Sequence, residues 1–319
     1  MEDIHLNEIP EQLRDVVVLA NRSAGTGAGA AALNEFKEQL ENRDLRVFLE
    51  SDIERFKSIV GELEAEESLR CVVAAGGDGT AELASNLTSP ETPLMVFPMG
   101  TENLLAKHLQ ITNDPTSAAE VVSGGSSFLF DAGIIDQKLF LIMFSCGFDA
   151  DVVHRLHSAR SGNINHLSYA KPILESIFSY QYPELHIRCW NGDQLVQELD
   201  SHWVFVFNVP SYAAGLGICP SANPHDGLLD VCTFDGGSFW HGIYHLSAVI
   251  LGQHQNLDGF RNVRATKIEI SSNDEVPFQI DGDPGGHIPT TIEVVRHRLN
   301  LLVSRDWLKR QAEGNFEGK

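Results

Sequence analysis

A glycine-rich turn between a strand and a helix constrains the fold of this 319-residue chain more than any other feature. Residues 76–80 read Gly-Gly-Asp-Gly-Thr, after the apolar run 71–75 and before the helix-compatible stretch 81–85. Glycines leave the backbone open to a ligand, and the first turn of a helix offers unpaired N–H groups and the positive end of its dipole. The carboxylate of Asp78 would repel phosphate there unless it holds Mg²⁺ or accepts a proton. The pattern predicts a phosphate-binding turn, with an ordinary glycine-rich connection as the alternative.

Short apolar runs alternate with helix-like stretches through the first third of the chain. Residues 16–20, 45–49, 71–75 and 94–97 are typical of buried strands, and residues 30–41 and 53–63 have helical spacing. This alternation predicts a parallel sheet covered by helices, in which ligands bind outside the carboxyl ends of the strands. Three glycine-containing loops follow such ends: a first loop at 21–29, a second loop at 76–80 and a third loop at 98–103.

The alternation of strand and helix signals ends after about residue 127. From there, short strand candidates follow one another with turn residues between them. They are residues 128–132, 139–144, 185–190, 202–208, 229–234, 265–271 and 292–295, interrupted by helices near 150–158, 167–180 and 239–251. This pattern favours an antiparallel β-sandwich over a barrel. We therefore predict an α/β domain with a parallel, Rossmann-like sheet (residues 1–132), a C-terminal antiparallel β-sandwich domain (133–305) and a tail (306–319) that could pack back on the first domain.

Charge and cysteine usage narrow the class of protein. The chain has 23 Lys and Arg residues against 44 Asp and Glu residues, a net charge of −21, which argues against binding nucleic acid or anionic membranes in general. The N-terminus lacks the pattern of a signal peptide, and no apolar run approaches the length of a membrane span. The five scattered cysteines have no Cys-x-x-Cys spacing and favour free thiols in a reducing compartment. We expect a cytoplasmic protein.

Two loops in order carry a family resemblance. The second loop, followed by Pro-Met-Gly-Thr-Glu-Asn at 98–103, resembles the diacylglycerol kinase catalytic-domain family, which includes bacterial lipid kinases and sphingosine kinases. Later segments are similar to the family's next blocks and follow in the same order. They are residues 145–150, 215–222, 226–231 and 279–283. The resemblance covers roughly residues 16–305 and implies a two-domain kinase of the NAD kinase-like superfamily.

The resemblance also implies roles for particular residues. ATP or its Mg²⁺ would be contacted by residues of the three loops and the helix after the second: Asn21, Ser23, Gly25, Gly76, Gly77, Asp78, Gly79, Thr80, Glu82, Gly100, Thr101 and Asn103. Asp281 and Asp283 would flank the acceptor hydroxyl, one as general base, with Asp78 as the third catalytic residue. A structural Mg²⁺ would be held by Asn223, Asp226 and the carbonyl of Leu228.

Two positions depart from the family pattern. Asp283 stands where the family usually has Glu, so that either the backbone lies closer to the acceptor or Asp281 is the base. Asn223 stands where the family has an acidic metal ligand, and a neutral oxygen binds a hard cation more weakly.

These observations lead to one expected function and two alternatives. We expect an ATP- and Mg²⁺-dependent lipid kinase, with diacylglycerol the leading acceptor and phosphatidic acid the product. It would contact the lipid transiently at the inner face of the membrane, and a homodimer is implied by resemblance alone. The alternatives are an NAD kinase, which shares the Gly-Gly-Asp-Gly loop and the two-domain plan, and a non-catalytic nucleotide- or lipid-sensing module.

Two weaker signals have ordinary explanations beside the functional ones. Residues 152–182 are locally basic and apolar, as a lipid-facing surface would be, although two helices packed on the β domain would have the same pattern. The pairs His154/His157 and His241/His245 could each face one way on a helix, but without a third ligand nearby we expect core or solvent-facing histidines.

Overall fold

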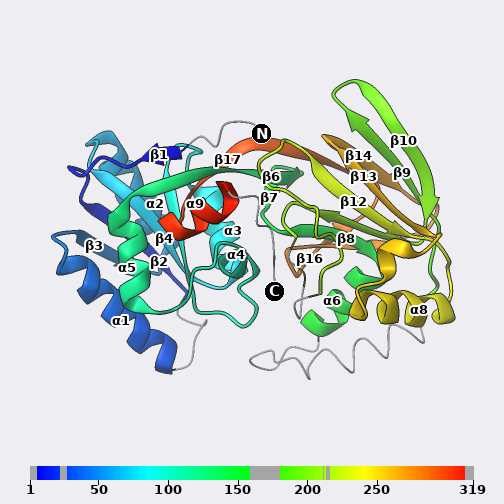
Figure 1. Ribbon diagram of the computed structural model, residues 1–319, viewed down its shortest axis with the longest axis horizontal. Helices are drawn as coiled ribbons and strands as arrows, with labels where there is room; N and C mark the ends of the chain where they lie inside the picture. The colour runs from blue at the N-terminus through cyan, green and yellow to red at the C-terminus, as the bar shows by residue number, and fades with distance from the viewer. Residues whose placement is uncertain (1–5, 22–26, 159–179, 211, 213–215, 313–319) are drawn as a thin grey trace. The chain divides into compact units, whose positions relative to one another are not determined.

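The computed structural model describes residues 6–21, 27–158, 180–210, 212 and 216–312, which fall into two compact units (Figure 1). The first unit runs to Phe130 and resumes at His297, and the second unit runs from Asp131 to Arg296. The predicted fold class is confirmed, because one unit contains a mainly parallel sheet with helices and the other contains antiparallel sheets.

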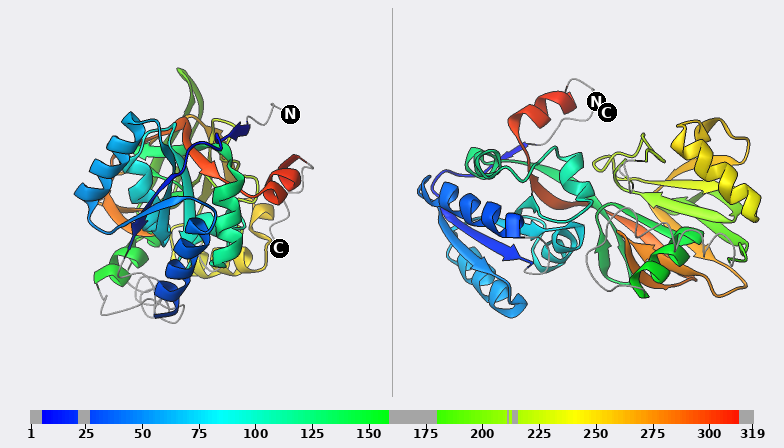
Figure 2. Two further views of the ribbon diagram at one scale, coloured as in Figure 1. Left: turned by 90° about the vertical axis from the view of Figure 1, so that its left-hand side faces the viewer. Right: turned by 90° about the horizontal axis from the view of Figure 1, so that it is seen from below.

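The first unit is built on a parallel sheet in the strand order β5-β4-β2-β3. Its strands are β2 (Asp15–Ala20), β3 (Arg46–Glu50), β4 (Leu69–Gly76) and β5 (Pro93–Pro98). All eight residues of β4 are buried, as expected for a central strand covered on both faces. The helices are α1 (Gly27–Glu41), α2 (Ile53–Ala65), α3 (Asp78–Leu87), α4 (Leu104–His108), α5 (Pro115–Gly124) and α9 (Arg305–Ala312), with α1 packed against α5 (Figure 2).

The end of the chain belongs to the first unit. β17 (Thr290–Leu302) pairs its last residues in parallel with β5, and α9 follows. Trp307 of α9 is 1% exposed; its ring centroid lies 5.4 Å from that of Phe128, and its Nε1 donates to the His108 carbonyl at 3.0 Å. The sequence suggested a tail from residue 306 that could pack on the first domain; in the structure the first unit resumes at His297. No loop marks this boundary, because one continuous strand contributes residues to both units.

Two antiparallel sheets form the second unit. One has the order β13-β12-β11-β8-β15-β16, from β8 (Met143–Gly147), β11 (Trp203–Phe207), β12 (Leu229–Phe234), β13 (Phe260–Ala265), β15 (Pro277–Ile280) and β16 (Asp283–His287). The other contains β9 (Leu185–Asn191), β10 (Gln194–Ser201), β14 (Lys267–Ser271) and the start of β17. Both sheets contribute to one apolar cluster that includes Phe144, Val204, Ile187 and Ile268. The expected sandwich is therefore present.

The remaining elements complete the two units. β1 (Leu6–Glu8) pairs with β6 (Ser126–Ile135), and β6 pairs with β7 (Lys138–Phe140). The second unit also has α6 (Phe148–Ser158), α8 (Phe239–Ile250) and the 3₁₀ turn η3 (His254–Asn256). No helix within the described residues combines the length and apolar content needed to cross a bilayer.

Candidate active site

The three loops meet at the carboxyl edge of the first unit's sheet. Asn21, directly after β2, donates its N–H to the Ala75 carbonyl at 3.0 Å and its Nδ2 to Thr80 Oγ1 at 3.4 Å. Met99, directly after β5, donates its N–H to the Gly76 carbonyl at 2.8 Å. Hydrogen bonds thus join the first and third loops to the second loop and the end of β4, as expected for loops that follow the carboxyl ends of neighbouring parallel strands.

Glycines allow the second and third loops to approach each other. A Cβ built on Gly100 would lie 2.7 Å from Gly77 Cα and 2.8 Å from Asn103 Oδ1, closer than any real Cβ contact. One built on Gly76 would lie 2.1 Å from Thr80 Oγ1. Gly76 and Gly100 therefore have no room for a side chain. The backbones of the second and third loops are in close contact at Gly77 and Gly100.

Asp78 connects the second loop to the helix after the third. Its Oδ2 accepts from Leu104 N–H at 2.9 Å and its Oδ1 from Leu105 N–H at 3.1 Å, so the carboxylate caps α4. The two hydrogen bonds lower the pKa of Asp78, but burial has the larger effect and raises it above its ordinary value. Asn103 is the N-cap residue of α4 but makes no side-chain cap bond there, which leaves the first N–H groups of the helix to Asp78.

The N-terminus of α3 is open in a way that suits an anion. Gly77 is its N-cap residue and provides no side-chain cap, so that the first helical N–H groups lack the partner that Ser, Thr or Asp would supply. Gly79 in the first turn is exposed. These groups and the dipole of α3 favour a negatively charged ligand beside Gly77 and Gly100.

Other residues expected at the nucleotide site have different surroundings. Asn103 closes its own loop, with Nδ2 donating to the Gly100 carbonyl at 2.7 Å and Oδ1 accepting from Gly100 N–H at 2.9 Å. Glu82 is buried on α3, where its Oε1 accepts from Asn86 Nδ2 at 3.2 Å. Thr101 is exposed. Ser23 and Gly25 lie outside the described residues.

In the second unit, Asp281 lies in the turn between β15 and β16 with a φ of 50°, and Asp283 is the first residue of β16. The Asp281 carboxylate accepts three backbone N–H bonds, from Leu141 at 2.7 Å, Ile142 at 2.9 Å and Met143 at 2.8 Å. Asp283 is half-buried, and none of the described residues hydrogen-bonds or ion-pairs with its carboxylate. The two carboxylates therefore differ: one is held by the backbone and the other is available.

A buried polar network supports this turn. Asp149 accepts from the hydroxyls of Ser145 and Tyr212 and from Gln279 Nε2, the last at 3.2 Å. Burial raises the pKa of Asp149, and these hydrogen bonds oppose that effect. Gln279 Oε1 in turn accepts from Gly282 N–H at 2.8 Å. Asp149 and Gln279 were not among the predicted site residues, although they lie in the segments 145–150 and 279–283 that resemble the family.

The expected structural Mg²⁺ site does not fit the side chains found there. One oxygen of Asp226 is paired with Arg264 Nη2 and the other accepts from Leu228 N–H at 3.0 Å, while Arg264 Nε lies 3.9 Å from Asp230 Oδ2. The Oδ1 of Asn223 is buried without a hydrogen-bond partner in the described structure, but one amide oxygen is a weak ligand. The guanidinium of Arg264 already supplies the positive charge, and the described residues contain no cluster of three or more His, Cys, Asp or Glu suited to a metal.

Two further signals from the sequence carry no site. His154 Nε2 bonds to the Phe278 carbonyl at 3.0 Å and His245 Nε2 to the Asp235 carbonyl at 2.6 Å, as structural histidines do. The basic, apolar segment 152–182 lies mostly outside the described residues, which exclude 159–179.

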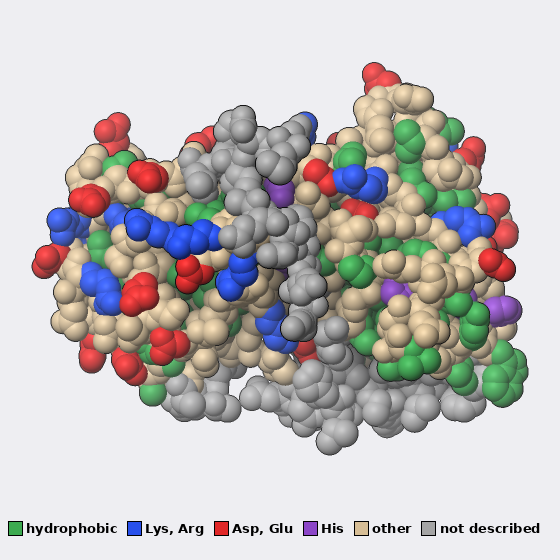
Figure 3. All heavy atoms as spheres, in the orientation of Figure 1, with side chains coloured by type: hydrophobic (Ala, Val, Ile, Leu, Met, Phe, Trp, Pro, Cys, Tyr) green, Lys and Arg blue, Asp and Glu red, His purple; other side chains and the backbone are tan. Residues whose placement is uncertain are grey.

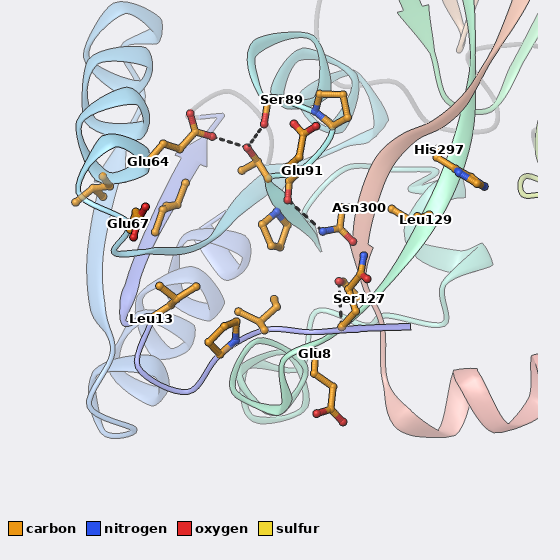
Figure 4. A pocket seen from close by; sticks show the side chains of 18 residues that line it. Glu8, Leu13, Glu64, Glu67, Ser89, Glu91, Ser127, Leu129, His297 and Asn300 are labelled. Atoms are coloured by element: carbon orange, nitrogen blue, oxygen red, sulfur yellow. Dashed lines mark hydrogen bonds between the residues drawn. The ribbon is translucent and has the colours of Figure 1, made fainter. Parts of the chain in front are cut away.

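A pocket of about 840 Å³ lies at the opposite edge of the first unit's sheet (Figure 4). Leu69 and Pro93, the first residues of β4 and β5, line it, whereas the glycine loops follow the last residues of these strands. Asn300 donates from its wall to the Glu91 carbonyl at 3.2 Å. This pocket is therefore separate from the candidate nucleotide site.

Comparisons with known proteins cover nearly the whole chain. The model of the diacylglycerol kinase catalytic domain matches residues 15–134, and that of the YegS C-terminal NAD kinase beta sandwich-like domain matches residues 143–303. A diacylglycerol kinase of Mycobacterium tuberculosis is 25% identical over 303 residues, which cover 92% of this chain and 96% of the relative. A diacylglycerol kinase of Bacillus subtilis is 23% identical over 240 residues, 74% of this chain and 78% of the relative.

Solved structures share the fold. A diacylglycerol kinase from Bacillus anthracis superimposes with a TM-score of 0.70 at 19% identity, covering 92% of this chain and 98% of that one. An NAD kinase from Archaeoglobus fulgidus in complex with ATP superimposes with a TM-score of 0.50 at 12% identity, covering 96% and 99%. At these identities the likeness concerns architecture alone.

Proposed function

The chain belongs to the diacylglycerol kinase catalytic-domain family, and we propose that it transfers the γ-phosphate of ATP to a lipid hydroxyl, with diacylglycerol the leading acceptor. This family consists of kinases, so the chain is an enzyme of the phosphotransferase class. The observation that best supports the proposal is the uncapped N-terminus of α3 beside the contact between Gly77 and Gly100.

The first unit would hold the nucleotide. Phosphoryl transfer depends mainly on positioning and on neutralising phosphate charge, which backbone N–H groups and a helix dipole can supply. Mg²⁺ would enter with ATP as part of the substrate and offset its remaining charge. Asp78 would serve as a positioning residue, because its carboxylate holds α4 and thereby the third loop.

The second unit would activate the acceptor through Asp283. A general base must have an oxygen available for the proton of the hydroxyl. The three N–H bonds to Asp281 stabilise its charged form and occupy both of its oxygens, whereas no described residue engages Asp283. We therefore assign the base to Asp283 and the support of the turn to Asp281, Gln279 and Asp149. The acceptor and ATP would meet at the inner face of the membrane.

A transfer assay tests the proposal. Purified protein receives ATP labelled at the γ-phosphate and Mg²⁺, with diacylglycerol, ceramide, a sphingoid base, phosphatidylglycerol, a polyprenol or NAD as acceptor, the lipids in detergent micelles. Labelled phosphatidic acid is the expected product. Labelled NADP would instead assign the NAD kinase activity that the shared architecture allows, and ATP binding without any product would favour a sensing module.

A further inference from the structure

The region around α8 is free of charged side chains. Residues 236–257 contain no Asp, Glu, Lys or Arg, although such residues make up 21% of the chain. The titratable side chains in this stretch are three histidines and Tyr244, which are uncharged or only partly charged at neutral pH. A surface helix normally alternates an apolar stripe with charged residues, so α8 is unusual for an element at the surface of a water-soluble fold.

One face of α8 is anchored to the second unit. His245 is 5% exposed and donates to the Asp235 carbonyl, and its ring centroid lies 6.0 Å from that of Trp203. A Cβ built on Gly242 would approach the Trp203 ring to 3.3 Å, which shows how closely the helix packs there. These contacts fix which face of α8 is turned outward.

The outward face is apolar and exposed. Trp240 is 74% exposed, Tyr244 55%, Ile250 63% and Leu251 70%, and their spacing of i, i+4, i+10 and i+11 puts them on one side of the helix. Ten large hydrophobic side chains are exposed in the described structure, and six of them lie between 240 and 251. Figure 3 shows hydrophobic side chains gathered over α8, whose position Figure 1 labels. A patch of this kind normally meets an apolar partner.

We propose that α8 docks the enzyme on its membrane, with its outer face in the interfacial layer of a phospholipid bilayer. The proposal rests on the proposed function, which requires an acceptor held in a bilayer. Trp and Tyr have apolar rings with a polar tip and are enriched at the headgroup level, and aliphatic side chains reach the acyl boundary.

The charge distribution determines which kind of bilayer α8 would bind. With a net charge of −21 the chain as a whole is repelled by anionic headgroups, and α8 carries neither acidic residues that add to the repulsion nor basic residues that offset it. Docking through α8 is therefore driven by apolar insertion. We expect binding to zwitterionic vesicles that added salt does not weaken, and weaker binding when anionic lipid is added at low salt.

Co-sedimentation with phosphatidylcholine vesicles tests the proposal on the full chain. The double variant Trp240→Ser/Ile250→Ser replaces two exposed side chains and should lose about tenfold or more in vesicle partition. The matched control Leu195→Ser/Val196→Ser changes two side chains of β10 that are each 38% exposed, and should bind vesicles as the wild type does. Equal binding by the wild type and the α8 variant, or no binding by the wild type, would overturn the proposal.

Two further measurements separate membrane docking through α8 from dimer formation through the same face and from failure of the proposed kinase function. Sedimentation equilibrium without lipid should give the same mass for the wild type and the α8 variant. A dimer that the variant dissociates, with vesicle binding unchanged, would assign the face to a second copy and overturn the proposal. Phosphorylation of a short-chain diacylglycerol, dissolved below its micelle concentration, should be equal in both proteins. No turnover by either protein, with vesicle binding lost only in the variant, would refute the kinase function and still support docking.

Discussion

Replacing Gly100 with alanine tests the contact between the second and third loops. The added methyl would lie 2.7 Å from Gly77 Cα and 2.8 Å from Asn103 Oδ1. Carbon atoms in ordinary contact are about 3.5–4.0 Å apart, so the third loop has to move by roughly 1 Å. It cannot move freely, because Met99 is bonded to the Gly76 carbonyl and Asp78 holds Leu104.

The displacement falls where the phosphates are proposed to lie. A misplacement of about 1 Å at a reacting group costs on the order of 100-fold in rate, so we expect kcat/KM for phosphate transfer to fall by about that factor. Overpacking itself costs about 1–3 kcal/mol, which a fold of ordinary stability survives. Far-ultraviolet circular dichroism and urea unfolding would show that Gly100→Ala remains folded.

Gly61→Ala is the matched control for this measurement. A Cβ on Gly61, in the middle of α2, meets nothing within 4 Å. Alanine is the better helix former by about 1 kcal/mol, so this variant should be slightly more stable and fully active. Transfer by Gly100→Ala within about threefold of the wild type would refute the argument, since it would mean that the loop contact does not position the phosphates.

Three further predictions concern stability. Burial lowers the pKa of His225 to about 4 from the usual 6.5. Because the unfolded chain takes up the proton first, up to about 3 kcal/mol of stability is lost as the pH falls from 6.5 towards 4. Urea unfolding of His225→Gln across this pH range should lack that loss. Trp307→Ala should cost about 3–5 kcal/mol in the same assay, whereas Trp307→Phe, which keeps a ring but loses the bond to His108, should cost about 1 kcal/mol. Removing divalent ions with EDTA should leave the melting temperature of the wild type unchanged, because Arg264 supplies the cation beside Asp226, and a rise in melting temperature on adding Mg²⁺ would contradict that assignment.

The sequence could predict the elements whose cause is local. Buried runs such as 71–75 and the glycines after them determine a strand and a turn without help from distant residues. Strands β10 and β13 were not predicted, because the cause of their strand structure is not local. The first seven residues of β10 are exposed or half-exposed, and they form a strand because they pair with β9 rather than through an apolar pattern of their own.

In the candidate site, too, the residues could be predicted from local motifs but their contacts with distant residues could not. Motifs identified Asp78, Asp281 and Asp283, yet they could not separate their roles, because the deciding hydrogen bonds come from remote backbone. Asp78 is bonded to Leu104, 26 residues along the chain, and Asp281 to Leu141, 140 residues away. Arg264 was likewise not foreseen beside Asp226, since the two are 38 residues apart and meet only when β12 and β13 pair.

The most direct test of the central claim is the rate of phosphatidic acid formation from ATP and diacylglycerol in mixed micelles by Asp283→Asn, measured beside the wild type. The substitution keeps the size of the side chain and removes the proposed proton acceptor. We expect kcat to fall by about 10²- to 10⁴-fold, with the dissociation constant of ATP unchanged. Near-normal turnover by Asp283→Asn would contradict the assignment of the base, and no lipid product from the wild type would contradict the proposed function itself.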